Sequence, residues 1–116
     1  MLTESEEQIL VMQWAELMKG KYPELEALHH IPNGGKRNIV TAVRMKKEGV
    51  KKGVPDLCLP VPRKGYHGLY IEMKRLKGKT SKEQDWWIEF LTKEGYAVEV
   101  CRGFEQAKDV IIYYLT

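Results

Sequence analysis

The stretch Leu69-Tyr70-Ile71-Glu72-Met73-Lys74 decides how this chain folds and where its chemistry lies. Side chains alternate across a β-strand, so the apolar residues of this stretch share one face and the polar ones the other. The apolar face, Leu69, Ile71 and Met73, must pack on a core. Glu72 and Lys74 therefore lie together on the opposite face, as an acid and a base fixed close to each other.

A second strand is expected at Asp56-Leu57-Cys58-Leu59, after a break at Gly53-Val54-Pro55. If the two strands pair with their polar faces aligned, Asp56 lies beside Glu72. Two carboxylates and the Lys74 ammonium group then converge, which suits a hard divalent cation and an activated water. The alternative is that Glu72 and Lys74 belong to the solvated face of an ordinary amphipathic strand. Pro60 and Pro62 limit the second strand and indicate an end or an edge.

The sequence on either side of these strands predicts a mixed α/β architecture. Apolar spacing and stop signals predict a first helix over 4–19 and a second over 38–48, with a short piece from Pro23 and a loop over 31–35 between them. A further helix over 81–94, a strand over 96–101 and a closing helix with the stripe Phe104, Ala107, Ile111 and Tyr114 complete the order. Helices and strands in this order form an α/β layer structure.

Two helix starts carry further candidate residues. Ser81-Lys82-Glu83-Gln84 has the form of a capping box, and Gln84 also falls on the stripe that faces the sheet. Its amide either serves a nearby site or simply caps the backbone of Ser81. In the first helix, either Glu4 or Glu7 can project inward, although acidic residues in a first turn commonly only complement the helix dipole.

Length and composition bound the class of protein. The 116 residues, 43% hydrophobic and 30% charged, fit one soluble domain over 1–116 with a real core. No apolar run is long enough to span a bilayer, and the acidic start Thr3-Glu4-Ser5-Glu6-Glu7 is unlike a secretory signal, so we expect no membrane and a cytoplasmic protein. Cys58 and Cys101 are expected to be free thiols. The three histidines, His29, His30 and His67, show no zinc-ligand spacing and are expected on the surface or in loops.

Positive charge gathers in the loops, although the net charge of +3 is too small to prove a polyanion partner. Cations near a carboxylate site fit a phosphodiester substrate, and Asn33-Gly34-Gly35 can bring backbone N–H groups close to a phosphate. The alternative is a solvated surface. The expected nucleic-acid contacts are Asn33, Gly34, Gly35, Lys36, Arg37, Lys52, Arg75, Lys77 and Lys79.

Three segments together resemble a known family: Gly49 to Leu57 (GVKKGVPDL), Gly68 to Lys74 (GLYIEMK) and Ser81 to Gln84 (SKEQ). They are similar to the virus-type replication-repair nuclease (VRR-NUC) domain of the PD-(D/E)XK nuclease superfamily. Ile31-Pro32-Asn33-Gly34-Gly35 and Gly95-Tyr96-Ala97-Val98 also fit, so the resemblance covers nearly the whole chain. It implies a restriction-endonuclease-like core, in which a central mixed sheet is flanked by helices.

The resemblance also implies a role for each site residue. Asp56 and Glu72 would bind a divalent metal, Mg²⁺ or Mn²⁺, with the backbone carbonyl of Met73. Lys74 would orient the attacking water and stabilise charge, which we favour over proton abstraction because two carboxylates beside an ammonium group favour its charged form. Gln84 would be the polar helper. The first-helix Glu of the family favours Glu4, which is followed by Gln8, with Glu7 as the alternative.

The expected function is therefore that of a metal-dependent endodeoxyribonuclease acting on branched DNA such as Holliday junctions. Stand-alone domains of this type in phages and bacteria act as homodimers, which implies a homodimer in the cytoplasm of a bacterial or phage-infected cell. Two alternatives stay open. One is a nucleic-acid-binding module that kept the fold and lost catalysis, and the other is a protein–protein adaptor.

Overall fold

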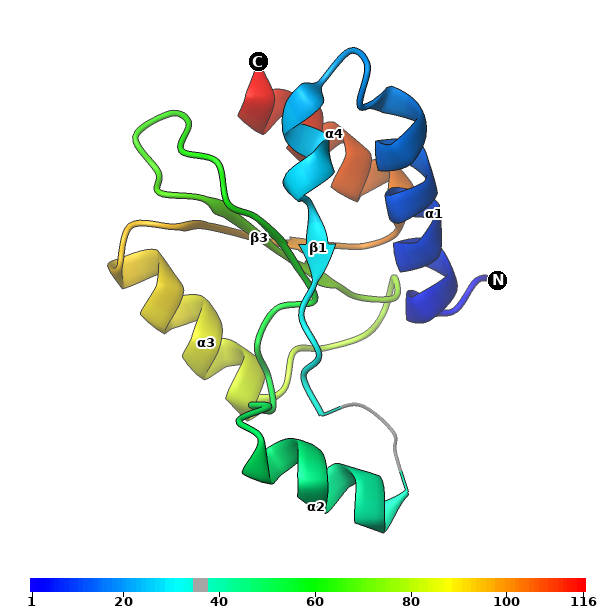
Figure 1. The fold of residues 1–116 in the computed structure, drawn as a ribbon, viewed down its shortest axis with the longest axis vertical. Helices are drawn as coiled ribbons and strands as arrows, with labels where there is room; N and C mark the ends of the chain where they lie inside the picture. Colours follow the sequence, from blue (N-terminus) through cyan, green and yellow to red (C-terminus); the bar gives the residue numbers. More distant parts are fainter. Residues whose placement is uncertain (35–37) are drawn as a thin grey trace.

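The computed structural model describes residues 1–34 and 38–116. Within this part of the chain, a four-stranded sheet is flanked by helices (Figure 1). The elements, in chain order, are α1 (Glu4–Met18), the 3₁₀ helix η1 (Pro23–Ala27), β1 (His29–His30), α2 (Ile39–Lys47), β2 (Leu57–Leu59), β3 (Leu69–Met73), α3 (Lys82–Lys93), β4 (Ala97–Cys101) and α4 (Phe104–Leu115). The predicted α/β class and the predicted elements are confirmed, with ends shifted by one or two residues.

The sheet has the strand order β1-β2-β3-β4, with β1, β2 and β3 antiparallel and β4 parallel to β3. A parallel pair needs a long crossover, and α3 provides it between β3 and β4. The short β1 was not expected from the sequence. Because β1 pairs with β2, the second strand is not at an edge; Pro60 only ends it. Of the two alternatives, an end is confirmed and an edge is wrong. The neighbouring strand β1 was missed because its two residues are too few to give a periodic signal.

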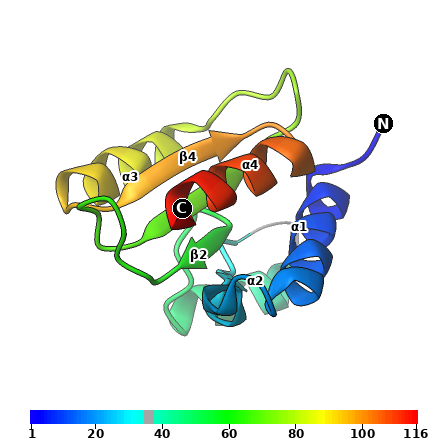
Figure 2. The ribbon, with the colours of Figure 1, turned by 90° about the horizontal axis from the view of Figure 1, so that it is seen from above.

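The core lies between one face of the sheet and the helices α1 and α4. It gathers the apolar residues of β2 and β3 with Val11 and Ala15 of α1 and Ala107, Ile111 and Tyr114 of α4. Helix α3 packs along β4 on the other side of the sheet, and Figure 2 shows α3 and α4 on opposite sides of that strand. The layers therefore leave the polar face of β3 beneath α3.

Helix α2 stands apart from these layers. It has no buried residue, and Figure 1 shows it extending away from the sheet. Asn38 caps its start by accepting from the N–H of Thr41 at 2.8 Å. Cys58 and Cys101 are both buried free thiols, as expected. No helix in the described ranges is long and apolar enough to cross a membrane.

Candidate active site

The pairing of β2 with β3 brings two carboxylates together. The strands run antiparallel with Leu57 opposite Ile71, so the next position along places Asp56 opposite Glu72. Oδ2 of Asp56 accepts a hydrogen bond from the backbone N–H of Met73 at 2.8 Å. This side-chain bond extends the pairing of β2 with β3 beyond the backbone hydrogen bonds. The predicted alignment of the two strands is confirmed.

Asn33 holds the other oxygen of Asp56. Its amide nitrogen Nδ2 donates to Asp56 Oδ1 at 2.8 Å and to the carbonyl of Val54 at 2.9 Å. The phosphate contact that the sequence suggested for the backbone at Asn33 stays a prediction, and the structure gives the side chain of Asn33 the separate task of fixing Asp56. Asn33 lies 23 positions before Asp56, and no local pattern signals a contact of that range.

Glu72 is buried rather than solvated. Only 2% of its surface is exposed, so the interpretation of this strand face as an ordinary solvated one is wrong for Glu72. Burial, and after it the charge of the neighbouring Asp56 carboxylate, raise its pKa to about 9. The Lys74 ammonium group opposes this rise, and Glu4 adds to it. The protonated acid is therefore the stable form of Glu72 at neutral pH.

Gln84 serves both of the roles that the sequence left open. Its Oε1 accepts the N–H of Ser81 at 2.8 Å, and its own N–H donates to the hydroxyl of Ser81 at 3.1 Å, which completes the capping box. Its Nε2 donates to Oε2 of Glu72 at 3.1 Å. The first turn of α3 is thereby fastened to the candidate site.

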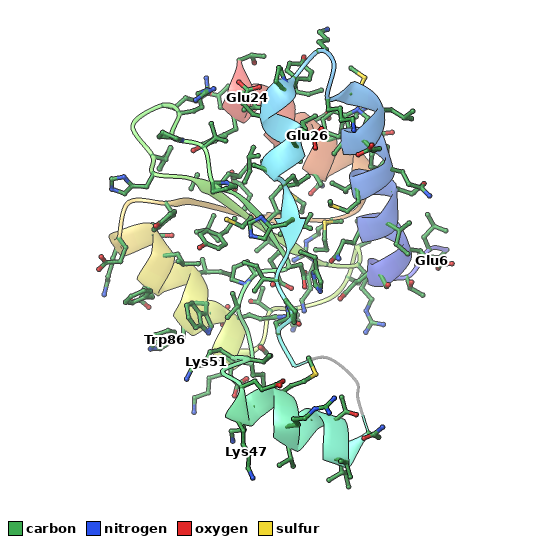
Figure 3. The ribbon with its side chains drawn as sticks, in the orientation of Figure 1. Glu6, Glu24, Glu26, Lys47, Lys51 and Trp86 are labelled. Carbon is green, nitrogen blue, oxygen red and sulfur yellow. The ribbon has the colours of Figure 1, made fainter. Side chains whose placement is uncertain are left out.

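The acidic residues at the start of α1 have three different environments. Oε2 of Glu4 accepts the backbone N–H of Arg75 at 3.1 Å, directly after Lys74. Oε1 of Glu7 instead accepts the N–H of Phe104 at 2.9 Å, at the start of α4. Glu6 completes a capping box with Thr3, and Figure 3 shows it on the outer side of α1. Of the three, the structure brings Glu4 to the site.

A pocket of about 260 Å³ opens between α1 and Asp56. Its lining includes His30, whose Nδ1 lies 2.8 Å from the carbonyl oxygen of Asp56. His30 is exposed, as expected, but sequence reasoning missed that β1 places it at the site. The lining is Glu4, Ser5, Gln8, His30, Asn33, Asp56 and Met73.

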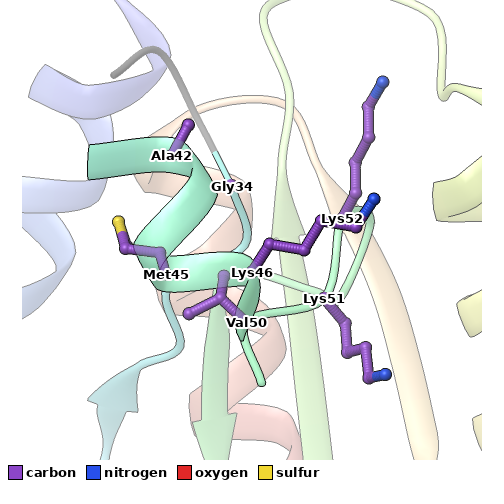
Figure 4. Close-up of a pocket in the computed structure, with 7 residues that line it drawn as sticks. All are labelled: Gly34, Ala42, Met45, Lys46, Val50, Lys51 and Lys52. Carbon is purple, nitrogen blue, oxygen red and sulfur yellow. The ribbon is translucent and has the colours of Figure 1, made fainter. Parts of the chain in front are cut away.

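The predicted nucleic-acid contacts fall into two groups. Arg75 and Lys79 line a cleft of about 710 Å³ together with Lys74 and Glu4, and Lys77 is exposed in the same segment. Gly34 and Lys52 lie elsewhere, in a pocket of about 390 Å³ beside α2 (Figure 4). Of the other four, Asn33 lines the pocket beside Asp56, and Gly35, Lys36 and Arg37 lie outside the described residues.

Gly53 allows the loop before β2 to approach the first turn of α3 closely. Its φ of +92° favours glycine, and a Cβ at this position would lie 2.6 Å from the backbone carbon of Glu83. Glu83 immediately precedes Gln84. The loop that delivers Asp56 and the turn that delivers Gln84 therefore touch at a point where no side chain fits.

The donor set has the chemistry of a hard-cation site. Oε1 of Glu72 is buried and has no hydrogen-bond partner among the described residues, next to the carboxylate of Asp56. Mg²⁺ is commonly held by one or two carboxylates, with waters and substrate phosphates supplying the other ligands. Within residues 1–34 and 38–116, no three His, Cys, Asp or Glu side chains form a group arranged to hold a metal ion. The site thus offers a carboxylate pair, with Glu4 nearby, and fits a cation that keeps water ligands.

Comparison with known proteins agrees with this geometry. A family model described as the VRR-NUC domain matches residues 2–105. A solved structure titled "VRR_NUC domain protein" is 38% identical in sequence and superposes with a TM-score of 0.84, covering 99% of this chain and 89% of that one. No curated protein matches the chain. With the fold, the motif-bearing strands and the family model in agreement, the chain belongs to the VRR-NUC domain family, a family of nucleases.

Proposed function

We propose that this protein, as a single domain over 1–116, is a metal-dependent endodeoxyribonuclease that hydrolyses phosphodiester bonds in branched DNA such as Holliday junctions. One observation carries the proposal: Asp56 lies beside a buried oxygen of Glu72 that has no hydrogen-bond partner among the described residues, and the charge of Lys74 acts on the same group. Burying Glu72 beside the carboxylate of the partly buried Asp56 is costly for stability, and strongly perturbed acids of this kind cluster at functional sites.

Each side chain has a task in this reaction. Asp56 and Glu72, with the carbonyl of Met73, would hold Mg²⁺ or Mn²⁺; when bound, such an ion supplies an acidified water and neutralises charge on the phosphate. Lys74 orients the attacking water and stabilises the charge that grows on the phosphate oxygens. Gln84 and Asn33 keep the two carboxylates in place. Water adds to phosphorus, one P–O ester bond breaks, and the leaving oxygen takes up a proton.

The basic cleft supports DNA as the partner. Arg75 and Lys79 line the same cleft as Lys74, so phosphates on either side of the cut can be neutralised next to the chemistry. A homodimer fits the proposal because a four-way junction is two-fold symmetric and two strands must be cut. A cytoplasmic location agrees with DNA as the substrate.

The test is cleavage of a four-way junction with Mg²⁺ by wild type, Lys74→Ala and Asp56→Asn. Each substitution should lower the rate by about 100-fold or more. Lys93→Ala and Asp109→Asn make the same changes of charge at exposed positions on α3 and α4, and should leave the rate unchanged. Full activity of both site variants would refute the proposal. Junction binding by wild type without cleavage, and without metal binding in calorimetry, would identify a binding module instead.

A further inference from the structure

The guanidinium group of Arg102 gathers three backbone carbonyls of one segment. Arg102 lies between β4 and α4, and its Nη1 is 2.9 Å from the carbonyl oxygen of Arg75, 3.2 Å from that of Leu76 and 2.6 Å from that of Gly78. These carbonyls belong to the turn that connects β3 to α3. All three contacts go to the one nitrogen Nη1, so its N–H donors are shared among the three carbonyl oxygens.

The same turn carries the cations of the cleft. The sequence Arg75-Leu76-Lys77-Gly78-Lys79 places three basic side chains within five residues, directly after Lys74. Its start is tied down by backbone and α1 contacts: Lys74 N–H donates to the carbonyl of Cys101 at 2.9 Å, and Arg75 N–H donates to Glu4 at 3.1 Å.

Past Arg75 the support comes from Arg102. One turn hydrogen bond closes the segment, from Gly78 N–H to the Arg75 carbonyl at 3.0 Å. Among the described residues, one side chain from outside the turn hydrogen-bonds residues 76–79, and it is that of Arg102. Without the donors of Arg102, residues 76–79 would be more flexible.

We propose that Arg102 is a positioning residue for nucleic-acid binding, acting by holding residues 75–79 in the conformation that directs Arg75, Lys77 and Lys79 toward the DNA backbone. Ordering a flexible loop on binding costs free energy, and a loop that is already ordered avoids that cost. The choice of DNA as the ligand rests on the proposed function, whereas the clamp itself is a property of the fold. Because the donors of Nη1 face carbonyls of the protein, Arg102 acts through the turn rather than by touching DNA.

Trypsin tests the clamp without DNA, since it cleaves after Arg75, Lys77 and Lys79. Arg102→Met should speed cleavage at these three bonds by about tenfold, because hydrogen bonds to a charged group are among the stronger ones. Arg102→Lys should give an intermediate rate, and it stands in if Arg102→Met does not fold. Lys93→Met, on the surface of α3, should cleave like wild type at the three bonds. Unchanged cleavage in a folded Arg102→Met protein would overturn the clamp.

A double-mutant cycle tests the link to DNA, with binding to a four-way junction measured in EDTA so that no cleavage occurs. Arg102→Met should weaken binding several-fold in wild type and clearly less in a Lys77→Gln/Lys79→Gln background, where of the three positioned cations only Arg75 remains. An equal loss in both backgrounds would mean that Arg102 touches DNA itself, and would overturn the positioning role. If wild type binds no DNA, the proposed function and the DNA part of this inference fail together, and the trypsin result still decides the clamp.

Discussion

Nε2 of Gln84 donates to Oε2 of Glu72 at 3.1 Å, while Oε1 of the same amide accepts the N–H of Ser81 at 2.8 Å. One side chain thus caps α3 and orients a buried acid at the end of β3. The start of the helix and the position of the acid are therefore coupled.

The two tasks of Gln84 can be separated by substitution. Gln84→Glu keeps the capping acceptor but removes the donor to Glu72, and Gln84→Ala removes both. We expect both variants to lose about 10- to 100-fold of the junction-cleavage rate, as is typical of partners that orient metal-binding groups. Only Gln84→Ala should lose the cap as well, so its thermal midpoint should be the lower of the two. Full activity of Gln84→Glu would show that the bond to Glu72 is dispensable.

The raised pKa of Glu72 predicts how stability depends on pH in the metal-free protein. Burial, with the neighbouring charge of Asp56, raises the pKa from its ordinary 4.5 to about 9. Below pH 4.5 both the folded and the unfolded states are protonated at this group, so its contribution to stability is fully present. Between pH 4.5 and 9 the unfolded state loses the proton first, and the free energy of unfolding should fall by up to about 1.4 kcal/mol per pH unit.

Urea unfolding in EDTA at pH 5.5, 7 and 8.5 measures this slope. Glu72→Gln carries no ionisable group at the position, so its stability should vary less steeply with pH than that of wild type. Parallel profiles for the two proteins would contradict the protonated state of Glu72.

Metal binding at neutral pH should release a proton. If Glu72 is protonated in the metal-free protein, a cation that binds its carboxylate must displace about one proton at pH 7. Calorimetric titration with Mn²⁺ in HEPES and in Tris should therefore give different apparent enthalpies, because the two buffers take up the proton with different heats. Glu72→Gln should bind weakly and show no such difference. Equal enthalpies for wild type in both buffers would count against Glu72 as a ligand.

Gly53 and Gly49 form a matched pair for testing the contact between the loop before β2 and α3. Both have positive φ, +92° and +106°, so alanine costs about 1–2 kcal/mol of backbone strain at either position. A Cβ at Gly49 meets nothing within 4 Å, whereas one at Gly53 would lie 2.6 Å from the backbone of Glu83. Gly53→Ala should therefore be clearly the less stable in thermal unfolding and should lose activity, while Gly49→Ala should stay active. Equal effects of the two substitutions would show that the close approach does not matter.

The sequence predicted those parts of the fold that depend on near neighbours. Alternation over Leu69–Met73 gave the face of β3, and Ser81 to Gln84 gave the start of α3. The strand β1 was missed because two residues have no measurable period. Pro60 was compatible with an edge as well as an end of the second strand, because a proline that ends a strand does not indicate whether another strand pairs alongside.

For the candidate site, too, the sequence predicted some residues and missed others. Asp56 and Glu72 were found because the strand faces and the order of the strands constrain each other. The supports of the site were not found, since each joins distant segments: Asn33 to Asp56, and Arg102 to the turn after β3. Glu4 and Glu7 could not be told apart from helix spacing, and their partners, Arg75 and Phe104, decided between them.

The sequence by itself determined which residues alternate along strands, cap helices and form turns. From these patterns it identified Asp56, Glu72 and Lys74 as the candidate site residues. Only the tertiary structure decided that Glu72 is buried, that one of its oxygens has no partner within residues 1–34 and 38–116, and which side chains bind the other oxygens of the carboxylate pair. The physical reason is that periodicity and capping depend on bonds within a few residues, whereas burial and its effect on a pKa depend on how whole elements pack.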